Sequence, residues 1–176
     1  MEEQIYITHN VQETEALAKD LAPMLKSAPA VALYGGLGMG KTAFTRGLTA
    51  ALSCTVPASS PTYTIVNEYP GPRKVCHFDM YRLGDADALY DIGWEDYLES
   101  GALCITEWSE NVPGVFPEGT VEIHFRRIDD ETREIKVKLC SYSHWILPER
   151  WPPAHCCRMV WCWICSSRIP RWITAV

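Results

Sequence analysis

Apolar residues recur along the chain with two periods, which together predict alternating strands and helices. The short apolar run Ala30 to Tyr34 is typical of a buried strand. From Thr42 to Leu52 the apolar residues return every three or four positions, as on one face of a helix. A second stripe predicts an earlier helix that starts at the capping pair Asn10 and Glu13, and Pro23 should kink or shorten it.

The other predicted strands are runs rich in β-branched, aromatic and further apolar residues. They cover residues 4–8, 62–69, 74–79, 102–106, 120–127 and 133–140, and the last two form a hairpin. Residues 85–91 and 94–98 are expected to be short helices broken by Gly93. Strands alternate with helices early in the chain and hairpins dominate later, so the pattern predicts a mixed α/β fold.

A glycine-rich loop joins the strand at 30–34 to the helix that follows it. It reads Gly35-Gly36-Leu37-Gly38-Met39-Gly40-Lys41-Thr42 and fits the pattern G-x-x-x-x-G-K-[ST]. Glycines let the backbone bend around an anion, and successive N–H groups at the positive end of a helix then hold phosphate oxygens. We expect Lys41 to reach the β- and γ-phosphates and the Thr42 hydroxyl to lie on Mg²⁺. All eight residues are therefore candidates for nucleotide binding.

Together these elements predict a single P-loop NTPase-like α/β domain over residues 1–140, with a mixed sheet flanked by helices. A chain of 176 residues is long enough for one such domain to bury a core. Residues 141–176 differ in composition, and we interpret them as an irregular C-terminal tail, rich in tryptophan and cysteine and poorly ordered.

Two acidic residues end predicted strands, where a P-loop protein needs a carboxylate for Mg²⁺ or for the attacking water. Asp79 ends the strand at 74–79, and Glu107 follows the most apolar strand of the chain. We assign both to the site as catalytic and metal-binding candidates, together with Lys41. Their spacing leaves open which of the two carboxylates holds Mg²⁺.

The segment Ser60 to Thr64 follows the P-loop helix, where many P-loop proteins carry a switch that senses the γ-phosphate. Thr62 is the residue there that can offer a hydroxyl to the metal or the phosphate. Three other residues keep two interpretations each. His77 is either a site residue or merely a polar residue of the sheet, Trp108 either covers the site or a partner surface or belongs to the core, and Arg82 pairs either a phosphate or a nearby acid.

Four motifs together make the chain resemble a known family. Besides the glycine loop, they are Ser60-Pro61-Thr62-Tyr63, His77-Phe78-Asp79-Met80-Tyr81-Arg82-Leu83 and Ile105-Thr106-Glu107-Trp108. In order and spacing they resemble the TsaE family (also called YjeE), the P-loop ATPase of bacterial tRNA threonylcarbamoyladenosine biosynthesis. The glycine loop is common to many families, whereas the His-x-Asp-x-Tyr-Arg and Glu-Trp elements are much more specific.

The resemblance, which covers residues 1–140, implies a protein that binds ATP and hydrolyses it weakly. It also implies two partner proteins, TsaD and TsaB, which transfer a threonylcarbamoyl group to tRNA, so that tRNA is met only through that complex. TsaE would reset this machinery between turnovers. Since the sequence contains no Asn-Lys-x-Asp guanine signature, the choice of ATP rests chiefly on this resemblance.

The resemblance also suggests a role for each matching residue. Lys41 and Thr42 would bind phosphate and Mg²⁺. Glu107 matches the family's acid on the metal side, and Asp79 matches a residue needed for hydrolysis. Trp108 matches the tryptophan beside the site, and Thr62 falls in the switch segment.

Charge and composition narrow the classes of function. The formal charge of −6 argues against an extended surface for nucleic acid and agrees with docking on other proteins. No apolar run reaches the roughly 18 residues of a membrane span, and the acidic start of the chain differs from a secretory signal. We therefore expect a cytoplasmic protein with no membrane contact. In that reducing compartment four cysteines are expected to be buried free thiols: Cys54, Cys76, Cys104 and Cys140.

The tail at 141–176 holds five of the seven tryptophans and four of the eight cysteines, and its charge is +3 against −9 for residues 1–140. Three interpretations compete. Cys162-x-x-Cys165, with His155 and two further cysteines nearby, has the spacing of zinc ligands. Interleaved tryptophan and arginine are also typical of an amphipathic membrane or partner segment. We favour the third, an ill-packed extension such as an out-of-frame reading of the gene's end, because the tail lacks regular periodicity.

Two other functions use the same phosphate loop. A small-molecule kinase would need an acceptor site and a mobile lid with arginines, yet the stretch after Asp79 is short and acidic and carries only Arg82. A non-hydrolytic, nucleotide-gated binding module would use ATP only to order the segment Ser60 to Thr64. The ATPase and the module differ only in whether hydrolysis matters.

Overall fold

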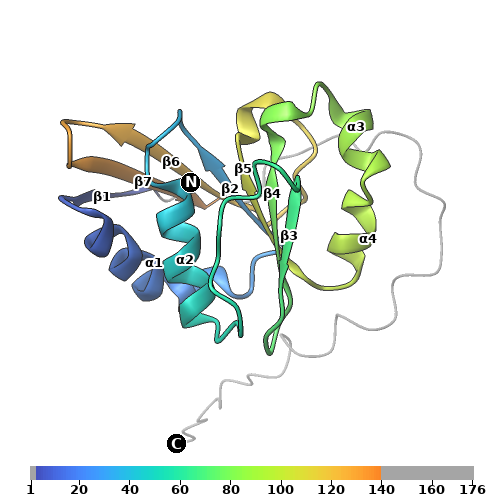
Figure 1. The fold of residues 1–176 in the computed structure, drawn as a ribbon, viewed down its shortest axis with the longest axis horizontal. Coiled ribbons are helices and arrows are strands. Elements are labelled where there is room, and N and C mark those ends of the chain that lie inside the picture. The colour runs from blue at the N-terminus through green and yellow to red at the C-terminus, as the bar shows by residue number, and fades with distance from the viewer. Residues whose placement is uncertain (1–2, 140–176) are drawn as a thin grey trace, which may run out of the picture. The chain divides into compact units, whose positions relative to one another are not determined.

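The computed structural model describes residues 3–139, whose strands form one mixed sheet (Figure 1). The seven strands are β1 (Glu3–Thr8), β2 (Ala30–Tyr34), β3 (Val66–Tyr69), β4 (Val75–Asp79), β5 (Leu103–Glu107), β6 (Val121–Arg127) and β7 (Arg133–Leu139). The α-helices are α1 (Val11–Leu25), α2 (Lys41–Ala51), α3 (Ala86–Asp91) and α4 (Trp94–Glu99). Short 3₁₀ helices, Met80–Arg82 and Ser109–Asn111, follow β4 and β5.

The order of strands across the sheet is β1-β7-β6-β2-β5-β4-β3. The four inner strands β6, β2, β5 and β4 run parallel to one another, while β1, β7 and β3 pair antiparallel with their neighbours. β2, which leads into the glycine loop, thus lies between two parallel neighbours. Since parallel strands end at the same edge of a sheet, the segments that follow β2, β4 and β5 lie close together.

Two apolar layers hold the helices against the sheet. α1 and α2 cover one face, where Phe44 and Leu48 are fully buried in the larger cluster (Figure 1). α3 and α4 cover the other face near β4, and Trp94 packs edge-on against Phe78 with ring centroids 5.1 Å apart. Both clusters consist of the residues whose spacing predicts buried strands and helix stripes.

Most predicted elements are confirmed, and the α/β fold with a mixed sheet between helices is the one observed. The pair of short helices is interrupted at Gly93, whose φ of 83° is in the left-handed region that glycine adopts readily. Asn10 caps α1 as predicted: its side chain accepts a hydrogen bond from Glu13 N at 2.8 Å. In return, Glu13 Oε2 accepts from His9 N at 2.7 Å.

One predicted boundary is wrong. The strand expected at 62–69 is only Val66–Tyr69, because Pro61 O accepts hydrogen bonds from the N–H groups of Thr64 and Ile65 and so closes a turn. Of the two effects expected of Pro23, shortening of the helix is not seen, since α1 continues through the proline to Leu25. In the last turn, a proline removes only the one hydrogen bond to the carbonyl four residues earlier.

Cys76 and Cys104 are buried free thiols as expected, whereas Cys54 is free but only partly buried. Cys140 and the tail at 141–176, including its zinc and amphipathic interpretations, lie outside the described residues. Among residues 3–139, no helix combines the length and the apolarity needed to cross a bilayer.

Candidate functional site

The glycine loop lies between the end of β2 and the start of α2. Gly38 and Gly40 have φ angles of 72° and 101°, and Gly35 has a φ of 132°. At Gly35 a side chain is excluded for a second reason, since a Cβ atom there would lie 2.8 Å from Phe125 O on β6. Gly40 precedes α2 without offering a side-chain cap. The amide groups of the first helical turn are therefore available to an anion.

A hydrogen-bonded cluster joins the start of α2 to the ends of β4 and β5. Thr42 Oγ1 donates to Glu107 Oε1 at 2.8 Å, and His77 Nε2 lies 3.0 Å from the same oxygen. Asp79 is the register partner of Glu107 on the neighbouring strand, and each of these carboxylates is 5% exposed. The parallel pairing of β4 with β5 thus brings both predicted acids to the hydroxyl at the start of α2.

Glu107 is held in its charged form despite its burial. Burial by itself raises the pKa of its carboxyl, but hydrogen bonds from His77 and Thr42 and the nearby charge of Lys41 act in the opposite direction. The pKa of Glu107 therefore lies below its ordinary value. A carboxylate kept ionised beside a hydroxyl is a suitable ligand set for a hard divalent cation such as Mg²⁺.

Lys41 is almost fully buried and folds back on the loop that precedes it. Its Nζ donates to the carbonyl oxygens of Gly35 and Gly36, the latter at 2.8 Å, and lies 4.4 Å from the centroid of the Trp108 ring. Burial lowers the pKa of Lys41, and the carboxylates of Glu107, Glu110 and Asp79 oppose this effect. A phosphate group nearby would offer this ammonium a full negative charge in place of carbonyl dipoles.

Trp108 follows Glu107 with a φ of 58°, which is uncommon for a residue with a side chain. Its ring lies beside that of Tyr81, with centroids 4.9 Å apart, and lines the site together with Lys41. Strained backbone of this kind is found often at functional sites. Both of its interpretations have support, because the ring faces the loop lysine and also packs against the second apolar cluster.

A cavity of about 250 Å³ opens between the glycine loop and the ends of β4 and β5. Its lining contains ten of the twelve residues predicted from the sequence: Leu37, Gly38, Met39, Gly40, Lys41, Thr42, Thr62, Asp79, Glu107 and Trp108. Gly35 and Gly36 do not line it and instead supply the carbonyls that hold Lys41. Ser60 and Ala43 line it in addition.

The segment from Ser60 to Ile65 is connected both to the cavity and to Asp79. Ser60 Oγ and Thr62 Oγ1 are 2.7 Å apart, and both residues line the cavity. Ile65 has a φ of 66°, which strains a β-branched residue, and its carbonyl accepts a hydrogen bond from Asp79 N at 2.9 Å. A movement of Thr62 would therefore act on the backbone that positions Asp79.

The sequence left open whether Arg82 pairs a phosphate or a nearby acid. In the part of the chain that the structure describes, no ion pair of Arg82 is found and the residue does not line the cavity. Its guanidinium lies 5.6 Å from the centroid of the exposed Tyr63 ring. Arg133 was missed by sequence reasoning. It follows the hairpin turn, and its Nη2 donates to Gly38 O in the glycine loop at 3.4 Å. No motif marks this residue, because the contact spans 95 positions of the chain.

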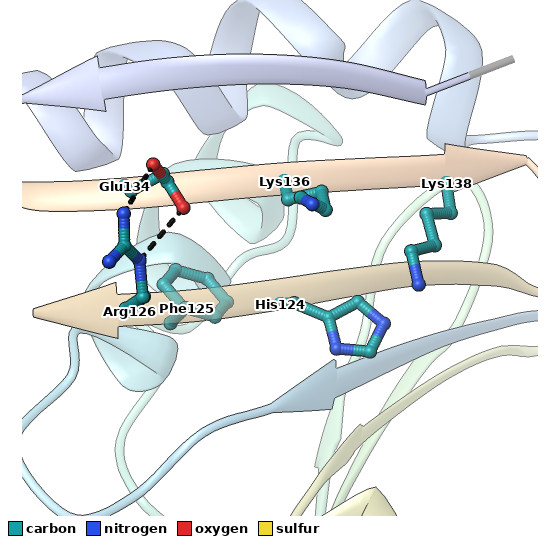
Figure 2. A pocket seen from close by; sticks show the side chains of 6 residues that line it. All are labelled: His124, Phe125, Arg126, Glu134, Lys136 and Lys138. Carbon is teal, nitrogen blue, oxygen red and sulfur yellow. Dashed lines mark hydrogen bonds and ion pairs between the residues drawn. The ribbon is translucent and has the colours of Figure 1, made fainter.

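A second hollow, of about 450 Å³, lies on β6 and β7, and none of the predicted site residues lines it. It is lined by His124, Phe125, Arg126, Glu134, Lys136 and Lys138 (Figure 2). Its charges are largely paired with one another or with a neighbour. Arg126 donates twice to Glu134, at 2.8 and 3.0 Å, and Lys136 reaches Glu3 at 2.8 Å. Its lining thus combines four basic side chains with one carboxylate, which is paired to Arg126.

The sequence and the fold were compared with those of known proteins. The family model described as "Threonylcarbamoyl adenosine biosynthesis protein TsaE" matches residues 8–135. The tRNA threonylcarbamoyladenosine biosynthesis protein TsaE of Bacillus subtilis is 36% identical over 129 residues, which are 73% of this chain and 80% of that protein. The protein of the same name from Treponema pallidum is 34% identical over 131 residues, 74% of this chain and 97% of the relative.

A solved structure is similar over the same region. The crystal structure of YdiB from Bacillus subtilis has a TM-score of 0.64 and 29% sequence identity, and the similarity covers 80% of this chain and 87% of that one. The residues matched by the family model, 8–135, include the glycine loop and all other residues that line the cavity.

Proposed function

The chain belongs to the TsaE family, which acts in tRNA threonylcarbamoyladenosine biosynthesis, and we propose that it serves this pathway by binding ATP with Mg²⁺ and hydrolysing it slowly. The observation that carries the proposal is the hydrogen bond of 2.8 Å between Thr42 Oγ1 and Glu107 Oε1. It joins the helix that begins after the phosphate loop to the acid at the end of a neighbouring parallel strand, which is the arrangement that P-loop proteins use for Mg²⁺.

Each residue of the cluster receives a role from its geometry. Backbone amides of residues 38–42 and the ammonium of Lys41 would hold the β- and γ-phosphates. Thr42 and Glu107 would hold Mg²⁺, which when bound neutralises charge on the phosphate oxygens. Asp79 lies beside Glu107 but on the next strand, and we assign it to orienting the attacking water. Thr62, on the strained segment that ends at Ile65, would respond to the γ-phosphate.

Slow hydrolysis by the protein alone is proposed from the charges that surround the cavity. Among the described residues, no arginine lines it, so Lys41 is the cationic side chain there that can stabilise charge on the transferred phosphoryl group. We propose that the TsaD and TsaB proteins supply the missing stimulation, in the cytoplasm, and that tRNA is met only through them. The acidic charge of the chain supports docking on proteins rather than on RNA.

ATP hydrolysis by the full chain, alone and with TsaD and TsaB, tests the proposal. We expect low turnover alone, a clear increase with both partners, and loss of turnover in Lys41→Ala. Lys19→Ala, which changes an exposed lysine of α1, is the matched control and should behave as the unchanged protein. Equal turnover with and without the partners would contradict the partnership.

The same experiment separates the other uses of a phosphate loop. Phosphoryl transfer to a small molecule in a substrate screen would identify a kinase. Nucleotide-dependent partner binding that survives both Glu107→Ala and Asp79→Ala would identify a non-hydrolytic switch. The absence of nucleotide binding in the unchanged protein would rule out all three functions.

A further inference from the structure

His77 is a buried histidine whose side chain forms its hydrogen bond with Glu107. The residue lies in the middle of β4, and its side chain is fully buried. Its Nε2 atom lies 3.0 Å from Glu107 Oε1. Its other ring nitrogen, Nδ1, is buried and has no hydrogen-bond partner among residues 3–139. A histidine is unfavourable as a simple packing residue here, because burying one ring nitrogen without a hydrogen bond costs free energy.

The partners settle which ring nitrogen carries the proton. The ionised Glu107 carboxylate can only accept, so Nε2 must donate to it. Nδ1 then carries a lone pair that has no donor among residues 3–139, but no N–H group is buried without an acceptor. The opposite tautomer would bury an N–H group without a partner and would place two acceptors 3.0 Å apart. The ring therefore acts as a donor to one atom.

That atom is shared with the helix that follows the phosphate loop. Thr42 Oγ1 also donates to Glu107 Oε1, at 2.8 Å, so two donors from different elements converge on one carboxylate oxygen. Two converging bonds set the direction of a carboxylate more tightly than one bond can. The Tyr69 ring, whose centroid is 6.3 Å away, packs beside the imidazole and limits its rotation.

We propose that His77 is a positioning residue, whose Nε2–H holds the Glu107 carboxylate in the orientation that receives the Mg²⁺ of a bound nucleotide. The inference rests on the proposed function. In other proteins, residues that hydrogen-bond to a metal ligand without touching the metal orient that ligand. Their loss typically lowers metal affinity or activity by about 10- to 100-fold. His77 itself touches neither the nucleotide nor the metal.

Three substitutions of His77 distinguish a hydrogen-bond donor to Glu107 from a side chain that only packs in the core. Glutamine carries its amide nitrogen as many bonds from Cα as Nε2 of histidine, so His77→Gln keeps a donor aimed at Glu107. Asparagine carries its nitrogen one bond earlier, at the place of Nδ1, so His77→Asn is equally polar but cannot reach. His77→Leu fills the volume with no donor.

The readout is ADP affinity by calorimetry, once with Mg²⁺ and once with EDTA, together with the melting temperature of each variant. We expect His77→Asn and His77→Leu to reduce the gain in affinity that Mg²⁺ gives by about 10- to 100-fold. Their affinity in EDTA should stay that of the unchanged protein, and His77→Gln should retain most of the gain. Equal Mg²⁺ dependence in His77→Leu and the unchanged protein, or equal losses in His77→Gln and His77→Asn, would overturn the inference.

A further measurement is made on the unchanged protein and needs a variant only for assignment. Nitrogen-15 chemical shifts of the histidine rings in the unchanged full chain report the tautomer directly, and His77→Gln assigns the signal. We expect the Nε2–H form, and a ring protonated only on Nδ1 would refute the inference. Failure of the unchanged protein to bind ADP in a Mg²⁺-dependent way would instead count against the proposed function.

Discussion

Single residues decide how the ends of the inner strands are held in place. At the ends of the strands that lie away from the site, Arg73 donates hydrogen bonds to four backbone carbonyl groups. Its Nη1 reaches Lys26 O and Ala28 O at 2.6 and 2.8 Å, and its Nε and Nη2 reach Gly101 O and Ala102 O, both at 2.8 Å. One guanidinium thus joins the segment before β2 to the segment before β5.

The number and plane of these donors predict that lysine cannot replace Arg73. Arg73→Lys keeps the charge but loses the planar fork, so some of the four carbonyls lose their partner. We expect the free energy of unfolding to fall by about 1.5–3 kcal/mol, measured by urea denaturation. Arg126→Lys is the control: that arginine is exposed, and its pair with Glu134 should contribute less than about 1 kcal/mol. An equal fall in the free energy of unfolding for Arg73→Lys and Arg126→Lys would contradict the role given to Arg73.

Between elements, α1 and α2 approach each other closely. Gly47 lies inside α2, and a Cβ atom placed on it would lie 2.2 Å from Glu15 O and 2.9 Å from Ala18 Cβ, both on α1. Glycine at position 47 has a lower helix propensity than alanine, but it allows α1 to pack closely against α2. Nothing in the sequence pattern of α2 distinguishes this requirement from an ordinary weak helix position.

Gly47→Ala is expected to destabilise the protein even though alanine favours helices. Propensity alone predicts a gain of about 1 kcal/mol, but the overlap with the backbone of Glu15 forces the helices apart and should cost about 1–3 kcal/mol or more. Thermal unfolding followed by circular dichroism measures the net change. Gly84→Ala, at a glycine with nothing near its Cβ position, should leave the melting temperature nearly unchanged. A higher melting temperature for Gly47→Ala would contradict the close packing.

Neighbouring strands β4 and β5 also bring together two buried thiols. Cys76 and Cys104 are register partners, and burial raises the pKa of Cys76 to about 11 and that of Cys104 to about 12. Both remain protonated in the folded protein well above the ordinary thiol value of 9.0. In the unfolded chain they lose their protons near that value, so the unfolded state gains stability as the pH rises.

The sign of this linkage predicts a loss of stability above pH 9. The contribution of each thiol is fully present below pH 9 and declines by up to about 1.4 kcal/mol per pH unit, from about pH 9 to 11 for Cys76 and from about pH 9 to 12 for Cys104. Urea unfolding at pH 8, 9 and 10 should show this decline, and Cys104→Ala should make it shallower. Cys54→Ala, which removes a partly buried thiol, should change the decline less. A stability that does not change from pH 8 to 10 would contradict the prediction.

At the scale of the whole molecule, residues 3–139 bring the predicted parts of the site together. The glycine loop, both carboxylates, Trp108 and the hairpin that carries Arg133 all belong to them. The composition of 141–176, with its excess of tryptophan and cysteine, is foreign to the pattern of the preceding domain.

We therefore expect a chain shortened to residues 1–140 to keep its nucleotide site. Its affinity for ADP with Mg²⁺, measured by calorimetry, should equal that of the full chain, because the lining described for the cavity lies within residues 37–108. Lys41→Ala in the same shortened chain is the control that should abolish binding. A shortened chain that cannot fold or bind nucleotide would show that the tail belongs to the domain.

Prediction from the sequence succeeded where a local signal existed. The glycine loop, the capping pair at Asn10 and the hairpin are encoded by neighbouring residues, and their positions are confirmed. It failed at residues 62–65, where β-branched residues favour a strand but hydrogen bonds to Pro61 O close a turn. It also missed Arg133, whose link to Gly38 spans most of the chain. For His77 it left two interpretations open, because its partner lies on another strand.

The sequence by itself determined the phosphate loop, the alternation of strands and helices, and the two acids at strand ends, since each depends on spacing along the backbone. Only the tertiary structure decided how these parts meet. The parallel pairing of β4 with β5 places Asp79 beside Glu107, and the packing of α2 places Thr42 within 2.8 Å of the same glutamate. Distances of this kind depend on strand order and register, which are set by burial of the whole sheet rather than by any one segment.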